Sequence, residues 1–188
     1  MAIKTFTTGE VLTASDTNTY LANSGLVYIT STTFSGSSLV SVSNAFTSTY
    51  SHYVVIGSFI GSGSSYALAK LQKAGTPSST GYYLTGNYTT YSSSAVNGYN
   101  GTNQTYFASG QYTAASNDGT TIKWELFNPQ SSTLKTMINT HFVDIGIGQQ
   151  YTFDVVHAVT DSYDGFTITP QGGTNITGTL TVYGYRKA

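Results

Sequence analysis

The chain has 188 residues, of which 8% are charged, with a formal net charge of −1 and no cysteine. This length fits one domain with a real core. The chain is rich in aromatic and β-branched residues, which argues against disorder. The lack of cysteine excludes disulfides and thiolate metal sites. The seven basic residues are scattered, which argues against a nucleic-acid partner, and no apolar run approaches the roughly 18 to 20 residues needed for membrane insertion.

The first 25 residues differ from the rest and predict an arm with a brief helix. Thr13 and Asp16 have the spacing of a capping box at a helix start, and Gly25 is placed as a helix stop. Between them Tyr20 and Leu21 supply a small apolar face. A helix of about two turns is not stable alone in water. We therefore expect the arm to pack on its own domain or on a neighbouring chain.

From residue 26 onward the sequence takes a period of two, which is typical of strands. The run 52–60 is long and apolar and predicts a central strand, and within 66–73 the residues Ala67, Ala69 and Leu71 share one face. The run 134–142 fits a strand or a short helix, and its threonines and β neighbours favour the strand. Other strands are predicted at 26–30, 38–42, 82–84, 121–127, 150–160, 165–169 and 176–185.

The segment 86–115 consists of Tyr, Ser, Asn and Gly with few aliphatic residues, so its strand register is weakly specified. Short strands are expected there around 106–108. About eight or more short strands separated by turns predict an all-β fold. We expect a single antiparallel β-sandwich, jelly-roll-like, over residues 26–188, preceded by the arm 1–25.

Seven tyrosines between positions 82 and 112 are interleaved with Ser, Asn and Gly. This mixture suits a contact surface, because tyrosine offers rigid amphipathic area and the small polar residues adapt. Sugars would stack on the rings and bond to the Asn and Ser side chains. The alternative is that the tyrosines form cross-strand pairs within and between subunits. The candidate ligand-binding residues are Tyr82, Tyr83, Tyr88, Tyr91, Tyr99, Tyr106 and Tyr112.

Acidic residues and a histidine crowd most closely at Asp154, His157, Asp161 and Asp164. Carboxylates with imidazole suit zinc or manganese, but this spacing matches no metal-loop pattern. On a strand Asp154 and His157 would point to opposite faces, and 161–165 has the composition of a turn in which aspartate bonds its own backbone. We therefore predict no metal and no cofactor, and keep these four residues as weak candidates.

The sequence also argues against catalysis. Serine is frequent, but no Gly-x-Ser-x-Gly elbow leads into a helix, and His52 and His141 are expected to be structural. Paired carboxylates for glycoside cleavage remain an alternative, although the long repetitive β-helix that polysaccharide depolymerases usually carry is missing. We predict a protein that is not an enzyme, with a carbohydrate-active enzyme or a lectin as the alternative.

Both ends of the chain carry segments that resemble a known family. Residues 5–21, TFTTGEVLTASDTNTYL, are similar to an opening segment of tailed-bacteriophage structural proteins, where it precedes otherwise unrelated fibre or tail modules. A β-sandwich module of phage virion proteins resembles the chain at 53–56, 68–71, 75–83, 164–168 and 175–186. Together these matches cover about half of the chain, and the ends are the more specific ones.

The resemblance implies a virion component, commonly homotrimeric, of the tail-fibre, receptor-binding or capsid-decorating class. Its arm would attach to other virion proteins through Phe6, Val11, Leu12, Tyr20 and Leu21. Here the opening leads directly into one β domain, which favours a short tail appendage or a capsid decoration over a long fibre. The expected partners are sister subunits, other virion proteins and, for a tail appendage, a polysaccharide or receptor on the host cell. A capsid cement protein with no host ligand is the alternative.

Overall fold

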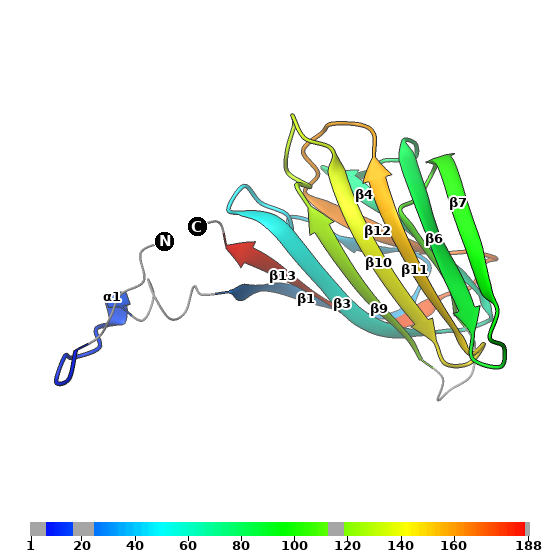
Figure 1. Ribbon diagram of the computed structural model, residues 1–188, viewed down its shortest axis with the longest axis horizontal. Coiled ribbons are helices and arrows are strands. Elements are labelled where there is room, and N and C mark those ends of the chain that lie inside the picture. Colours follow the sequence, from blue (N-terminus) through cyan, green and yellow to red (C-terminus); the bar gives the residue numbers. More distant parts are fainter. Residues whose placement is uncertain (1–6, 17–24, 113–118, 187–188) are drawn as a thin grey trace.

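The computed structural model describes residues 7–16, 25–112 and 119–186, and this part of the chain is almost entirely β (Figure 1). The elements, in chain order, are α1 (Ala14–Asp16), β1 (Leu26–Ser37), β2 (Val40–Val42), β3 (Tyr50–Gly61), β4 (Ser65–Lys73), β5 (Thr76–Pro77), β6 (Tyr82–Thr90), β7 (Val96–Gln104), β8 (Ala108–Tyr112), β9 (Thr120–Phe127), β10 (Thr136–Asp144), β11 (Gln149–His157), β12 (Gly165–Pro170) and β13 (Ile176–Arg186).

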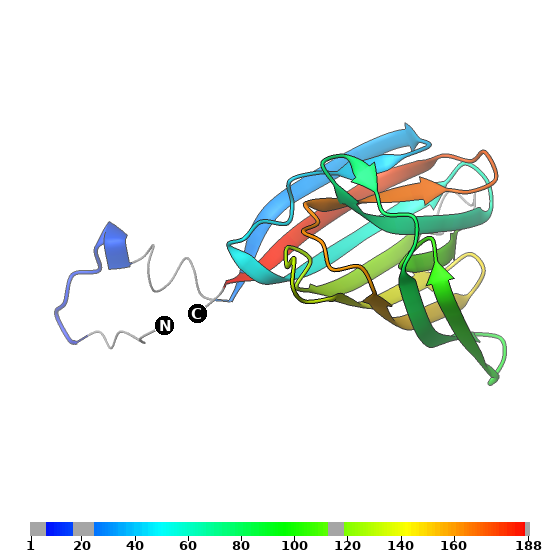
Figure 2. The same cartoon turned by 90° about the horizontal axis from the view of Figure 1, so that it is seen from above.

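The strands form two antiparallel sheets that lie face to face (Figure 2). The large sheet has eight strands in the order β1-β13-β3-β9-β10-β11-β6-β7. The small sheet has the order β2-β12-β4-β5, and β8 also pairs with β4. The predicted all-β antiparallel sandwich is therefore confirmed, including β3 as an interior strand and a strand rather than a helix at β10.

Eight of the strands follow the order of a jelly roll, with β1-β13-β3-β9 in one sheet and β2-β12-β4-β8 in the other. The remaining long strands are insertions into this framework. One hairpin, β6–β7, enters between β4 and β8, and a second, β10–β11, follows β9. Because both extend the large sheet on its β9 side, that sheet continues past the small one (Figure 1).

The core between the sheets is centred on Trp124 of β9, which is fully buried. Its indole meets the rings of Phe107 and Phe166 edge to face, with ring centroids 5.0 and 5.3 Å away. Edge-to-face pairs add to the stabilisation that comes from burial alone. Strands β9 and β10 alternate buried and exposed side chains, as expected of strands with one face on the core. Ala67, Ala69 and Leu71, predicted to share one face of β4, are all buried on the core side.

In the arm, Thr13 and Asp16 form the predicted capping box. The amide of Thr13 donates to the Asp16 carboxylate, and the amide of Asp16 donates to Thr13 Oγ1, at 3.2 and 3.1 Å. Val11 and Leu12 are exposed, while Phe6, Tyr20, Leu21 and the remainder of the predicted helix lie outside the described residues. Within the described part of the chain, no helix has the length and apolarity that crossing a membrane requires.

The main difference from the sequence prediction lies between residues 85 and 104. Strand β6 continues to Thr90, and β7 pairs with it from Tyr82 to Thr89. Nearly all β7 side chains are exposed because β7 lies at the end of the large sheet that extends past the small one. A strand that neither sheet face covers buries no apolar row, so its sequence lacks the period of two from which strands are predicted.

Candidate ligand-binding cleft

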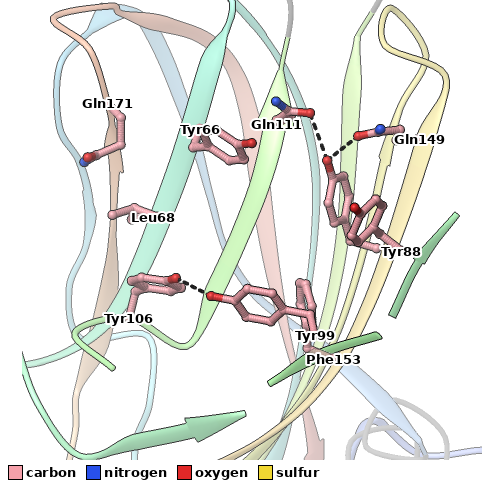
Figure 3. Close-up of a pocket in the computed structure, with 10 residues that line it drawn as sticks. Tyr66, Leu68, Tyr88, Tyr99, Tyr106, Gln111, Gln149, Phe153 and Gln171 are labelled. Carbon is pink, nitrogen blue, oxygen red and sulfur yellow. Dashed lines mark hydrogen bonds between the residues drawn. The ribbon is translucent and has the colours of Figure 1, made fainter. Parts of the chain in front are cut away.

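A cleft of about 680 Å³ lies where the large sheet extends past the edge of the small one (Figure 3). Its size is within the range of roughly 300 to 1,000 Å³ that is usual for small-molecule sites. The inner face of β11, β6 and β7 forms one wall, and the outer face of β4 and β8 forms the other. The inserted hairpins therefore supply a wall that a plain jelly roll would lack.

The wall on the large sheet is aromatic. Tyr88 and Tyr151 are directly opposite each other on β6 and β11, and their rings stack with centroids 5.6 Å apart. Phe153 follows on the same face of β11, and Tyr99 of β7 meets it edge to face at 5.5 Å. Gly86 lies opposite Phe153, where a Cβ would come within 2.7 Å of the phenyl ring. Glycine at this position lets the aromatic wall form without displacing β6.

The wall on the small sheet combines aromatic and amide side chains. Tyr66 and Leu68 point outward from β4, on the face opposite Ala67 and Ala69. Gln111 comes from β8, Gln171 follows β12, and Tyr106 precedes β8. This wall presents ring faces together with amide donors and acceptors, which is the composition of a site that binds polar ligands with apolar faces.

Hydrogen bonds connect the two walls (Figure 3). The Tyr151 hydroxyl lies 3.0 Å from Gln111 Oε1 and also bonds to Gln149 Oε1. The hydroxyls of Tyr99 and Tyr106 are 2.9 Å apart. Burial raises the pKa of Tyr106 and of Tyr151. These hydroxyls therefore stay protonated at neutral pH and keep their capacity to donate.

None of the described residues that line the cleft carries a charge. A charged ligand group that entered the cleft would lose hydration without gaining an ionic partner there. A neutral ligand rich in hydroxyl groups meets no such penalty, because glutamine and tyrosine offer both donors and acceptors. The cleft therefore favours neutral polyhydroxylated ligands over ions.

The structure divides the seven candidate tyrosines among four places. Tyr88, Tyr99 and Tyr106 meet in the cleft. Tyr82 and Tyr112 are fully buried in the core, so their prediction as ligand contacts is wrong. The Tyr82 hydroxyl accepts from the amide of Leu71 at 2.9 Å, and the Tyr112 hydroxyl bonds to Thr174.

The other two candidates lie on the surface outside the cleft. Tyr83 points to the outer face of the large sheet, because neighbouring residues on a strand face opposite ways. Tyr91 follows the end of β6, is 62% exposed, and contacts Gly148 through its amide, which donates to the Gly148 carbonyl at 2.7 Å. Alternation on β6 separates Tyr82 from Tyr83, so closeness in sequence does not bring these residues together.

The four weak metal candidates have separate surroundings. As predicted, Asp154 and His157 are on opposite faces of β11, one exposed and the other buried. Asp161 pairs with Lys73 at 2.6 Å, and Asp164 accepts from the amide of Ala74 at 2.7 Å. Among the described residues, no three potential ligands gather into a group that could hold a metal ion.

His157, the last residue of β11, hydrogen-bonds to two loops. Its Nε2 lies 3.0 Å from Ser78 Oγ, and its Nδ1 lies 3.1 Å from the Val159 carbonyl oxygen and 3.2 Å from the Tyr163 hydroxyl. Burial lowers its pKa, so the imidazole is neutral at pH 7. Its partners are loop atoms, which gives it a structural role. Of the other two histidines, His52 packs edge to face on Phe127 and His141 is exposed on β10.

Sequence reasoning missed several lining residues. Tyr151 and Phe153 belong to the predicted strand 150–160, and its alternation places them on one face with Val155, which was a usable signal. Tyr66 carries no such signal, because it lies on the outward face of β4. The glutamines come from three separate elements, and only the fold brings them together: Gln111, Gln149 and Gln171.

No protein-family model, no curated protein and no solved structure matches the chain. Jelly rolls occur in viral capsid proteins and in lectins alike, and a fold by itself does not determine function.

Proposed function

We propose that the chain is a non-enzymatic binding module of a bacteriophage tail appendage, and that the cleft binds a neutral polysaccharide on the host surface. The class of ligand is inferred from the cleft itself, which combines aromatic walls with three glutamines and no charge among its described lining residues. The place in a virion rests on the resemblance at both ends of the chain.

The chemistry of the cleft matches that of a sugar chain. A pyranose has an apolar C–H face and a rim of hydroxyls. The stacked rings of Tyr88 and Tyr151 offer a platform for the apolar face. Gln111 and Gln149 already hydrogen-bond to a tyrosine hydroxyl, so sugar hydroxyls would enter an existing network.

Binding without catalysis is part of the proposal. Glycoside cleavage commonly needs two carboxyl groups about 5 to 10 Å apart beside the scissile bond, and the described lining residues include none. Single-site affinity in the millimolar range would be sufficient, because several copies on one particle engage a polymer together. The trimer that the resemblance implies would provide such copies.

Affinity electrophoresis in gels that contain dextran, glycogen, yeast mannan or galactomannan tests the ligand class. We expect at least one polymer to retard the wild-type chain. The double variant Tyr88→Ala with Tyr99→Ala should bind at least tenfold more weakly, and Tyr91→Ala serves as the matched control, because Tyr91 is exposed but outside the cleft. Free migration in all four polymers, or equal retardation of the double variant, would refute the proposal for the cleft.

The virion assignment has its own test. Antibody raised against residues 26–188 should label the tail or its fibres on intact particles viewed by electron microscopy. Label spread over the capsid would instead assign the chain to capsid decoration, and the host-binding role would fall. Absence of label on every particle structure would contradict a virion role altogether.

A further inference from the structure

The outer face of the large sheet carries a straight row of polar side chains on its inserted strands. Asn139 of β10 is directly opposite Asp154 of β11, which is opposite Thr85 of β6, which is opposite Asn100 of β7. All four side chains are exposed. Strands in a sheet are about 4.8 Å apart, so the row repeats at a distance comparable with the length of one hexose ring.

This row lines a shallow groove of about 690 Å³. Its apolar side is the next row of the same face, where Met137, Val156 and Tyr83 are opposite one another on β10, β11 and β6. Met137 is 53% exposed and Tyr83 is 45% exposed. An exposed tyrosine ring therefore lies beside a line of hydrogen-bonding groups on a rigid, paired surface.

The polar row offers acceptors and donors side by side. The side-chain amide of Asn139 donates to Oδ1 of Asp154, which orients both groups. Within the described part of the chain, no hydrogen bond reaches Oδ2 of Asp154. A carboxylate oxygen accepts strongly from hydroxyl groups, and an amide both donates and accepts. Neighbouring hydroxyls of one sugar can engage the two groups together.

Asp154 supplies the negative charge of the groove. On β9 the neighbouring Glu125 pairs with Lys123 at 2.8 Å, which offsets its charge. Asp154 is the one charged side chain among the described groove-lining residues. The groove thus differs from the cleft, whose described lining is uncharged.

We propose that this outer groove is a second saccharide site, which binds a neutral hexose through a pair of neighbouring hydroxyls. Asp154 accepts from these hydroxyls, Asn139 and Asn100 bond to the ring substituents, and Tyr83 stacks on the apolar face of the sugar. The site lies on the opposite face of β6 and β11 from the cleft, so each can exist without the other. One chain would hold saccharide on both faces of the same inserted strands.

Titration with methyl glycosides of glucose, mannose and galactose, followed by backbone and side-chain amide NMR of the whole chain, tests the groove. We expect signals of Thr85, Asn100 and Asn139 to shift with at least one glycoside. Asp154→Asn keeps the side-chain shape and removes the charge, and it should weaken the binding that these shifts report at least tenfold. Tyr83→Ala should do the same, whereas Tyr28→Ala, an exposed tyrosine at the far end of the same face, should not.

The outcomes separate the two sites. No shift at the outer face with any of the three glycosides, or unchanged titration in both Asp154→Asn and Tyr83→Ala, overturns the second site. The cleft proposal would stand in either case, because its readout is polymer retardation and its variants are Tyr88→Ala with Tyr99→Ala. That double variant should leave the outer-face shifts intact, and a loss of them there would mean that the shifts report the cleft.

Discussion

Gly110 lies on β8 against the ring of Phe142, and a side chain there should destabilise the sandwich. A Cβ at Gly110 would be 2.2 Å from Phe142 Cδ1, whereas ordinary contact begins at 3.4 Å. The ring would have to move by about 1 Å in an interior packed like an organic crystal. Phe142 is 1% exposed and lies next to Trp124, so it has little room to move.

The cost of Gly110→Ala follows from that overlap. Overpacking a core typically costs about 1–3 kcal/mol, while the reduced entropy of the unfolded alanine chain offsets about 0.4–1 kcal/mol. We expect a net loss of about 1–2 kcal/mol in the free energy of unfolding, which lowers Tm by about 2–8 °C for a chain of this size. Near-ultraviolet circular dichroism during heating would measure it through the packing of the aromatic core.

Gly98→Ala is the matched control for this prediction. Gly98 is also a strand glycine, but a Cβ there meets no atom within 4 Å. Its replacement should change the free energy of unfolding by no more than about 0.5 kcal/mol. If Gly110→Ala melts as high as Gly98→Ala, the close packing of β8 on β10 is not as described, and the wall that β8 contributes to the cleft is placed wrongly.

Three further predictions follow from individual contacts. Burial lowers the pKa of His157 in the folded chain, so the unfolded chain binds a proton first as pH falls. The free energy of unfolding should therefore be constant above about pH 6.5 and decrease as pH falls through the folded pKa. The urea midpoints of His157→Gln should lack this decrease. Tyr151→Phe removes the hydroxyl that bonds to Gln111 and Gln149, and should cost about 0.5–1.5 kcal/mol in chemical unfolding, a loss that unchanged midpoints would contradict. EDTA should leave Tm unchanged, and Asp161→Asn should shift Tm little, because its ion pair with Lys73 is exposed; a metal-dependent Tm would contradict this assignment.

Burial on one face made most of the fold predictable. Strands such as β9 and β13 alternate core and solvent residues, with Trp124 and Leu180 inward, and the period of two locates them. The same rule correctly predicts that Asp154 and His157 lie on opposite faces of β11. Strand β7 was not predicted because it lies beyond the small sheet, where nearly all of its side chains are exposed and no alternation of buried and exposed residues marks it.

The candidate site was predictable only in part. The high frequency of tyrosine in residues 82–112 indicates a segment that contributes to the cleft, but it does not indicate which face of a strand each ring occupies. Tyr82 and Tyr83 are adjacent, and one is in the core while the other is 45% exposed. Gln111 and Gln149 come from elements that meet only through the insertion of two hairpins into the jelly roll, so their proximity is a property of the topology.

The placement of the inserted hairpins separates folding from recognition. Trp124 lies on a framework strand, whereas the aromatic wall of the cleft is built on β6, β7 and β11 and the outer groove on these strands and β10. Substitutions on those three strands can alter what the surface recognises while most of the core stays intact. Under the proposed function, exposed positions on these strands could change what the protein binds while the inward-facing core residues stay the same, so the same framework could serve many targets.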